Sequence, residues 1–161
     1  MDKRAAIGVV FFLLVSLGGF FVWQKSQIKP VEIPAKESMI KKVDLSTQPD
    51  WVQKLKVVAK KGVSGNGLAN VTIYIDGMPK DMVSALSYVV QYQTSNKGTQ
   101  GAFSTTPLKI NGATTFSKTI DLGTCSTKSC VRHDGVTSVE VELNFTTTSG
   151  DTSVWTGTIN L

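Results

Sequence analysis

The chain has 161 residues, of which 41% are hydrophobic and 18% are charged, enough for one compact domain with additional segments. Its formal net charge is +5, but the basic residues are spread along the chain and few of them are arginines. Nucleic-acid binding needs clustered basic residues and is therefore not expected. Beyond its apolar N-terminus the chain is rich in Thr, Ser, Val and Gly, which favour strands and turns over helices.

The N-terminal region predicts a membrane anchor. Residues 5–23 (AAIGVVFFLLVSLGGFFVW) carry no charge, and a helix of that length spans about 28 Å, close to the hydrocarbon core of a bilayer. The segment contains no A-x-A cleavage site, and no lipobox cysteine is present. We therefore expect an uncleaved signal anchor in contact with membrane lipid, rather than a removed signal peptide or a buried core helix. Residues 1–4, which include Lys3 and Arg4, are expected to form a cytoplasmic tail.

Lys3, Arg4 and Ala5 ahead of the apolar segment, followed by a β-rich remainder, resemble the N-terminal region of archaeal type IV pilins and of small membrane proteins of the archaeal motility machinery. This resemblance implies a processed leader. Two features depart from it, because the glutamate found early in the bacterial pilin helix is missing and prolines follow soon after the apolar segment. A pilin-like subunit is therefore an alternative to the simple anchor.

Residues 24–50 are expected to form an extended linker. They contain Pro30, Pro34 and Pro49, several lysines and few large apolar residues, and proline biases its neighbours to extended conformations. At roughly 3 Å per residue, such a tether holds a domain tens of ångströms from the bilayer. The segment PAKESMIKKVDL can form one or two helical turns, so a docking segment is the alternative to a plain spacer.

From residue 51 to residue 161, apolar and polar residues alternate, which predicts strands. The clearest segment is VEVELNF, in which Val139, Val141, Leu143 and Phe145 share one face. Similar patterns predict strands at LKVVA, VTIYID, LSYVVQY, TTFSKTIDL and VWTGTINL, and an edge strand near residues 102–110. Turn signals separate these segments. About seven short strands predict an all-β fold, an antiparallel two-sheet sandwich that forms an exported domain over residues 51–161.

The stretch GNGLANVTIYIDG, a turn followed by a strand, resembles the entry to the second strand of immunoglobulin-like and transthyretin-like sandwich domains in bacterial and archaeal surface proteins. The resemblance covers this stretch only. It implies an immunoglobulin-like architecture and a role as spacer, adaptor or binding module, and it carries no catalytic residues.

Cys125 and Cys130 lie in the segment LGTCSTKSCVRHDG, together with the chain's only histidine, His133. A thioredoxin-type pair has two intervening residues, and a structural zinc site needs four ligands, with Asp134 as a strained fourth candidate here. A disulfide that closes a small polar loop fits better than a metal site or buried thiols. A disulfide indicates an oxidising compartment, so the domain is expected outside the cytoplasm and His133 in an exposed loop.

The sequence favours no catalytic mechanism, and we expect neither an enzyme nor a cofactor or metal. A single histidine leaves few options for acid–base chemistry, and no serine lies in a nucleophile-elbow context. Asp76, Asp81 and Asp121 each lie beside a turn signal, where aspartate is common. Asn70 and Asn144 begin glycosylation sequons, and Asn70 is the better candidate because Asn144 lies in mid-strand.

An anchor, a tether and a folded domain without catalytic residues favour a structural or interaction subunit of a prokaryotic cell-envelope assembly, such as an appendage, a secretion system or a membrane-enzyme complex. Protein partners would bind at sheet edges and loops. The alternative is an extracellular module that binds a glycan or a surface-layer protein. Its candidate stacking residues are Trp51, Tyr74, Tyr88 and Tyr92, and their exposure on one face would favour this alternative over a scaffold.

Overall fold

A computed structural model describes residues 38, 40–127 and 129–161. These residues are all-β and their sheets are antiparallel, as the sequence predicts. One sheet has the order β1 (Lys56–Val63), β2 (Ala69–Asp76), β6 (Thr115–Asp121). The second has the order β10 (Thr152–Asn160), β9 (Ser138–Thr147), β3 (Val83–Thr94), β4 (Gly98–Phe103), and β5 (Leu108–Lys109) also pairs with β3. A separate hairpin joins β7 (Gly123–Cys125) and β8 (Cys130–Arg132).

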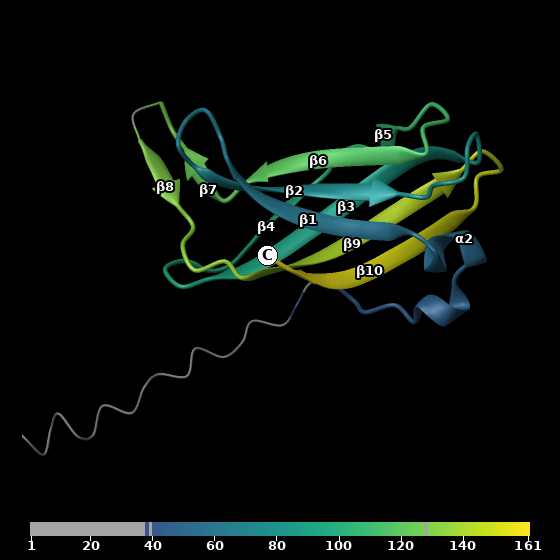
Figure 1. Cartoon of the computed structure of the whole chain (residues 1–161), viewed down its shortest axis with the longest axis horizontal. Coiled ribbons are helices and arrows are strands. Elements are labelled where there is room, and N and C mark those ends of the chain that lie inside the picture. Colours follow the sequence, from purple (N-terminus) through teal and green to yellow (C-terminus); the bar gives the residue numbers. More distant parts are fainter. Residues whose placement is uncertain (1–37, 39, 128) are drawn as a thin grey trace, which may run out of the picture. The chain divides into compact units, whose positions relative to one another are not determined.

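The two larger sheets face one another as a β-sandwich, with the β7–β8 hairpin at one end and the short helix α2 (Asp50–Gln53) at the other (Figure 1). Seven of the ten strands in the described residues have six or more residues. The other three have only two or three residues, too few for an alternating pattern to be visible in the sequence.

The core lies between the sheets and follows the predicted alternation. Val139, Val141, Leu143 and Phe145 of β9 are at most 1% exposed, and their neighbours along the strand face outward. Trp51 of α2 closes one end, because its ring meets the Phe145 ring edge-on with the centroids 5.3 Å apart. Helix α2 therefore belongs to the core, as the predicted start of the domain at residue 51 requires.

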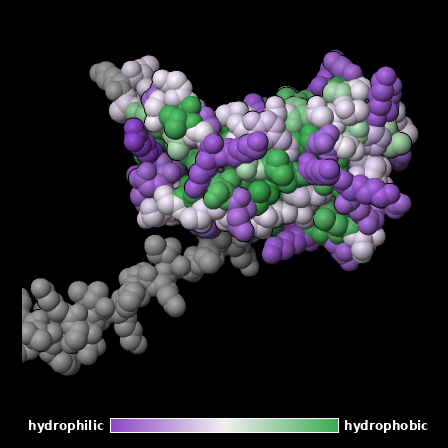
Figure 2. All heavy atoms as spheres, in the orientation of Figure 1, coloured by the Kyte–Doolittle hydropathy of each residue, from purple (hydrophilic) through white to green (hydrophobic). Residues whose placement is uncertain are grey.

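The core is incompletely covered along one side of the sandwich. In the view of Figure 2, apolar side chains lie along the middle of the visible face, where Figure 1 places β1 and β10, with hydrophilic side chains around them. Val57 and Ala59 of β1, and Ile159 of β10, are partly buried residues packed against the core.

The end of the predicted linker differs from expectation. Residues 38 and 40–48, which we call the N-terminal strap, pack on the second sheet instead of extending from it. Ile40 is only 7% exposed, and the 3-10 helix η1 (Leu45–Thr47) is capped by the Asp44 side chain, which accepts a hydrogen bond from Ser46 N. The prediction of an extended tether is therefore wrong for these residues.

The predicted tail at residues 1–4, the predicted membrane span at residues 5–23 and most of the predicted linker lie outside the described residues. Within residues 38, 40–127 and 129–161, no helix is long and apolar enough to cross a membrane.

Replacing Phe145 with alanine should lower the free energy of unfolding by about 3–5 kcal/mol, because a fully buried aromatic ring leaves a cavity. Phe103 is 65% exposed and provides the matched control. Phe103→Ala should change the stability by about 0.5 kcal/mol or less. Chemical unfolding of both variants measures the difference, and equal losses would contradict the assignment of the core.

Candidate functional site

A sheet edge exposes backbone N–H and C=O groups that can pair with another strand, and proteins usually protect such edges. The edges here are β1 and β6 in the first sheet, and β10 and β4, continued along β3 by the two-residue β5, in the second. Three of these four edges are protected by a covering segment or by charge, whereas on β4 only the Gln100 side chain engages an edge group, by donating to Thr99 O at 2.8 Å.

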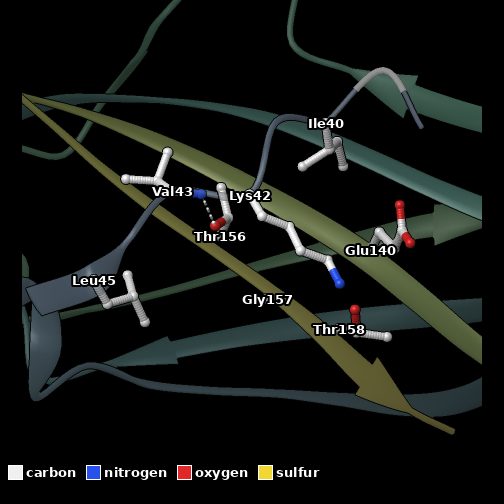
Figure 3. A pocket seen from close by; sticks show the side chains of 8 residues that line it. All are labelled: Ile40, Lys42, Val43, Leu45, Glu140, Thr156, Gly157 and Thr158. Atoms are coloured by element: carbon white, nitrogen blue, oxygen red, sulfur yellow. Dashed lines mark hydrogen bonds between the residues drawn. The ribbon is translucent and has the colours of Figure 1, made fainter. Parts of the chain in front are cut away.

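The edge of β10 is covered by the N-terminal strap. Gln48 accepts a hydrogen bond from Val154 N through its side-chain oxygen at 2.9 Å. Val43 N donates to the Thr156 hydroxyl at 3.0 Å, which holds the strap against the outer face of β10 (Figure 3). A further strand therefore has no direct access to this part of the β10 edge.

The edges of β1 and β6 are protected by charge. Lys56, Lys60 and Lys61 lie along β1. On β6, Lys118 pairs with Ile73, a core residue, so the Lys118 side chain is on the inner face of its strand, and its ammonium lies 6.0 Å from the centre of the Tyr88 ring. Charged side chains along an edge, and especially inward-pointing ones, oppose edge-to-edge pairing.

The β4 edge is uncharged and open. Its sequence, GTQGAF, contains neither a charged residue nor proline. Ser104 N donates to Tyr88 O at 3.0 Å, which fixes the alternation of the antiparallel ladder between β3 and β4. The N–H groups of Thr99, Gly101 and Phe103 consequently point away from β3, toward solvent.

Phe103 lies beside this open edge and is 65% exposed. Its pairing with Val89, whose other neighbour is Glu142 of β9, places all three on the outer face of the sheet. Gly101 lets β4 approach β3 closely, because a Cβ atom at this position would lie 2.7 Å from Val90 O. The β4 edge and Phe103 together form the β4 surface, an extended strand that offers backbone donors and one aromatic side chain.

A cavity of about 250 Å³ lies between the N-terminal strap and the second sheet. Figure 3 shows Lys42 of the strap extended toward Glu140 and Thr158, with Ile40 and Leu45 contributing apolar walls. Ser38 donates a hydrogen bond to the Glu140 carboxylate at 2.6 Å. The carboxylate is thus already engaged in holding the strap.

The four predicted stacking residues do not form one exposed face. Tyr88 and Tyr92 are buried at 9% and 4% exposure, and Trp51 packs against the core, so the prediction is wrong for these three. Only Tyr74, on the outer face of the first sheet, is substantially exposed, at 41%. The alternation in LSYVVQY already groups Tyr88 and Tyr92 with the core residues Leu86 and Val90.

The predicted disulfide between Cys125 and Cys130 is confirmed. The two residues are opposite one another at the tip side of the β7–β8 hairpin, and both are exposed. The Asn66 side-chain amide lies 3.6 Å from the Cys125 sulfur, so a neighbouring loop contacts the hairpin. The disulfide consequently stiffens a hairpin at one end of the sandwich (Figure 1).

His133 is buried, at 8% exposure, which contradicts the prediction of an exposed loop residue. Its N–H donates to Leu122 O at 3.1 Å, and its Nδ1 lies 3.0 Å from the Tyr92 hydroxyl. Burial raises the pKa of the Tyr92 hydroxyl above its ordinary value. The pair anchors the return from the disulfide hairpin to the core.

The three aspartates beside turn signals, Asp76, Asp81 and Asp121, do not form a carboxylate pair or a metal site. Asp76 and Asp121 are at opposite ends of the β2–β6 ladder and cannot act as a pair. Asp81 lies in the loop before β3 with a positive φ of 59°. Within the described part of the chain, no three His, Cys, Asp or Glu side chains are grouped to hold a metal ion.

Asn70 is a poor glycosylation site in the folded domain. It is only 8% exposed, and its amide donates to the Ser64 hydroxyl at 2.9 Å. The amide nitrogen that would carry a glycan is thus poorly presented in the folded domain, and glycosylation of Asn70 stays a prediction. Asn144 faces outward from β9 and donates to Glu142.

No protein-family model matches the sequence, and no functionally characterised protein shows significant similarity to it.

Reduction of the Cys125–Cys130 disulfide should lower the free energy of unfolding by about 2 kcal/mol, as expected for a loop of this size. Alkylation followed by mass spectrometry provides the first test, since neither cysteine of the natively expressed protein should react until it is reduced. The double variant Cys125→Ser/Cys130→Ser is the control, and reductant should not change its stability. Alkylation without reduction would contradict an oxidised native state.

The domain should lose stability at alkaline pH partly through Tyr92. Because its pKa is raised on folding, the neutral phenol favours the folded state. This stabilisation is complete below about pH 10, the unfolded value, and is lost as the pH rises through the folded-state pKa.

Tyr92→Phe should therefore show a shallower decline of unfolding free energy between neutral and strongly alkaline pH than the wild type. At neutral pH it should lose about 1 kcal/mol with the hydrogen bond to His133. Identical slopes for the wild type and Tyr92→Phe would contradict the assignment.

Proposed function

We propose that this chain is a single-pass, membrane-anchored and non-catalytic interaction subunit of a prokaryotic cell-envelope assembly. Its β-sandwich lies outside the cytoplasm and binds a protein partner through the β4 surface. The observation that carries this proposal is the β4 edge, which is uncharged and open beside the exposed Phe103.

Strand addition suits this edge chemically. A partner segment in extended conformation satisfies the N–H groups of Thr99, Gly101 and Phe103 with its own carbonyl groups. The Phe103 ring then loses contact with water, and burial of an aromatic side chain is worth about 1.5–3 kcal/mol. The protection of the other three edges favours docking at β4 over random aggregation.

Two observations support a location outside the cytoplasm, and a third supports the proposed type of domain. The disulfide between Cys125 and Cys130 is typical of proteins in oxidising compartments. The apolar residues 5–23 are long enough for a membrane span, and the basic residues Lys3 and Arg4 favour a cytoplasmic N-terminus. The two-sheet antiparallel arrangement supports an immunoglobulin-like or transthyretin-like adaptor domain.

The full-length chain, extracted from its native membrane in mild detergent, should co-purify with its partner, and Phe103→Lys should weaken that association about tenfold or more. Lysine removes the apolar contact and places a charge at the edge. Val63→Lys is the matched control, because Val63 is 74% exposed at the end of β1.

Quantitative mass spectrometry of the purified material measures the association. Val63→Lys should retain the partner at the wild-type level. A wild-type chain that purifies alone as a monomer would contradict the subunit function. Equal retention by both lysine variants would exclude the β4 surface as the contact.

A further inference from the structure

The outer face of the first sheet carries one substantially exposed aromatic residue. Tyr74 is at the middle of β2 and pairs with Val58 on one side and Ser117 on the other. Its side chain is 41% exposed, whereas Tyr88 and Tyr92 on the second sheet are buried. The hydroxyl groups of Thr72 and Thr119, in the next outward-facing row, bind each other at 2.8 Å.

The Tyr74 ring is flanked by different groups on its two sides along the strand. The Lys60 ammonium lies 5.6 Å from the ring centre, and Lys60 pairs with Thr72, two residues before Tyr74. Asp76, two residues after Tyr74, pairs with Thr115 of β6. The Lys60 cation therefore occupies one side of the ring, and on the other side Asp76 lies between Thr115 and Lys56 of β1.

A hollow of about 420 Å³ lies on the side toward Asp76. We call it the Tyr74 hollow, and its lining consists of Tyr74, Ile75, Asp76, Thr115, Phe116 and Ser117. The side chains of Asp76, Thr115 and Ser117 make no hydrogen bond, ion pair or ring contact with another described residue. One aromatic ring, one carboxylate and two hydroxyls are thus available together.

This set of groups matches the chemistry of a sugar ring. The C–H groups on one face of a pyranose carry partial positive charge and are attracted to the electron-rich face of an aromatic ring. Its hydroxyl groups can donate hydrogen bonds to a carboxylate and exchange them with hydroxyl side chains. A few convergent polar groups around an apolar surface are typical of small-molecule sites.

We propose that the Tyr74 hollow binds a neutral saccharide, with the sugar ring stacked on Tyr74 and its hydroxyl groups bonded to Asp76, Thr115 and Ser117. The Asp76 carboxylate and the ammonium of Lys56, its partner on β1, carry opposite charges, so this end of the site favours a sugar without net charge. This site is separate from the β4 surface, which belongs to the other sheet, and neither proposal depends on the other.

Calorimetric titration of the full-length chain tests this site. The chain is kept in a detergent without a sugar headgroup and titrated with cellopentaose, chitopentaose and mannopentaose. At least one of them should bind with a dissociation constant of about 1 mM or below, equivalent to about 4 kcal/mol. Absence of binding by all three would overturn the proposal.

Two substitutions at one position separate stacking from folding. Tyr74→Ala should weaken binding at least tenfold, whereas Tyr74→Phe, which retains the ring, should bind within about threefold of the wild type. Asp76→Asn should weaken binding by an intermediate factor, and Val58→Ala, on the same face but outside the lining, should leave it unchanged.

Circular dichroism should show the same fold for every variant, because Tyr74 is an exposed residue. Wild-type affinity in Tyr74→Ala would place any bound saccharide elsewhere and overturn the proposal. Phe103→Lys should bind saccharide with wild-type affinity although it binds the partner protein weakly. Loss of partner binding and loss of saccharide binding can therefore be told apart.

Discussion

Unpaired backbone groups at the sheet edges are the constraint on which this structure depends. The sandwich buries its apolar faces between two open sheets, and an open sheet always leaves its last strands without partners. The N-terminal strap bonds to Val154 N through Gln48, and lysines lie on β1 and β6. Among the described residues, β4 carries neither a charged side chain nor such a covering segment, and its edge is therefore the one proposed to bind a partner.

The strap also defines how the folded domain begins. Ser38 and Val43 bond to side chains that are more than a hundred residues later in the sequence, Glu140 and Thr156. The strap is therefore fixed to the second sheet, the same sheet that carries β4.

The sequence predicted the core well, because period-two alternation directly reports which side chains face inward; Leu143 and Phe145 are examples. It missed contacts that depend on distant residues. Neither the strap on β10 nor the burial of His133 against Tyr92 leaves a local pattern, since both arise from pairing across the fold. Tyr74 could be found from the sequence as an aromatic residue in a predicted strand. The open edge of β4 could not, because it depends on the order of strands in the sheet, and alternation within one strand gives no information on that order.

Amide hydrogen exchange resolved at single residues, comparing the isolated full-length chain with the chain in its native membrane assembly, tests the central claim most directly. In the isolated chain the N–H groups of Thr99, Gly101 and Phe103 should exchange rapidly, because the β3–β4 ladder leaves them facing solvent. In the assembly these same three groups should become protected, as a partner strand pairs with β4. Unchanged rapid exchange at all three positions, in an assembly that demonstrably contains a bound partner, would contradict the account.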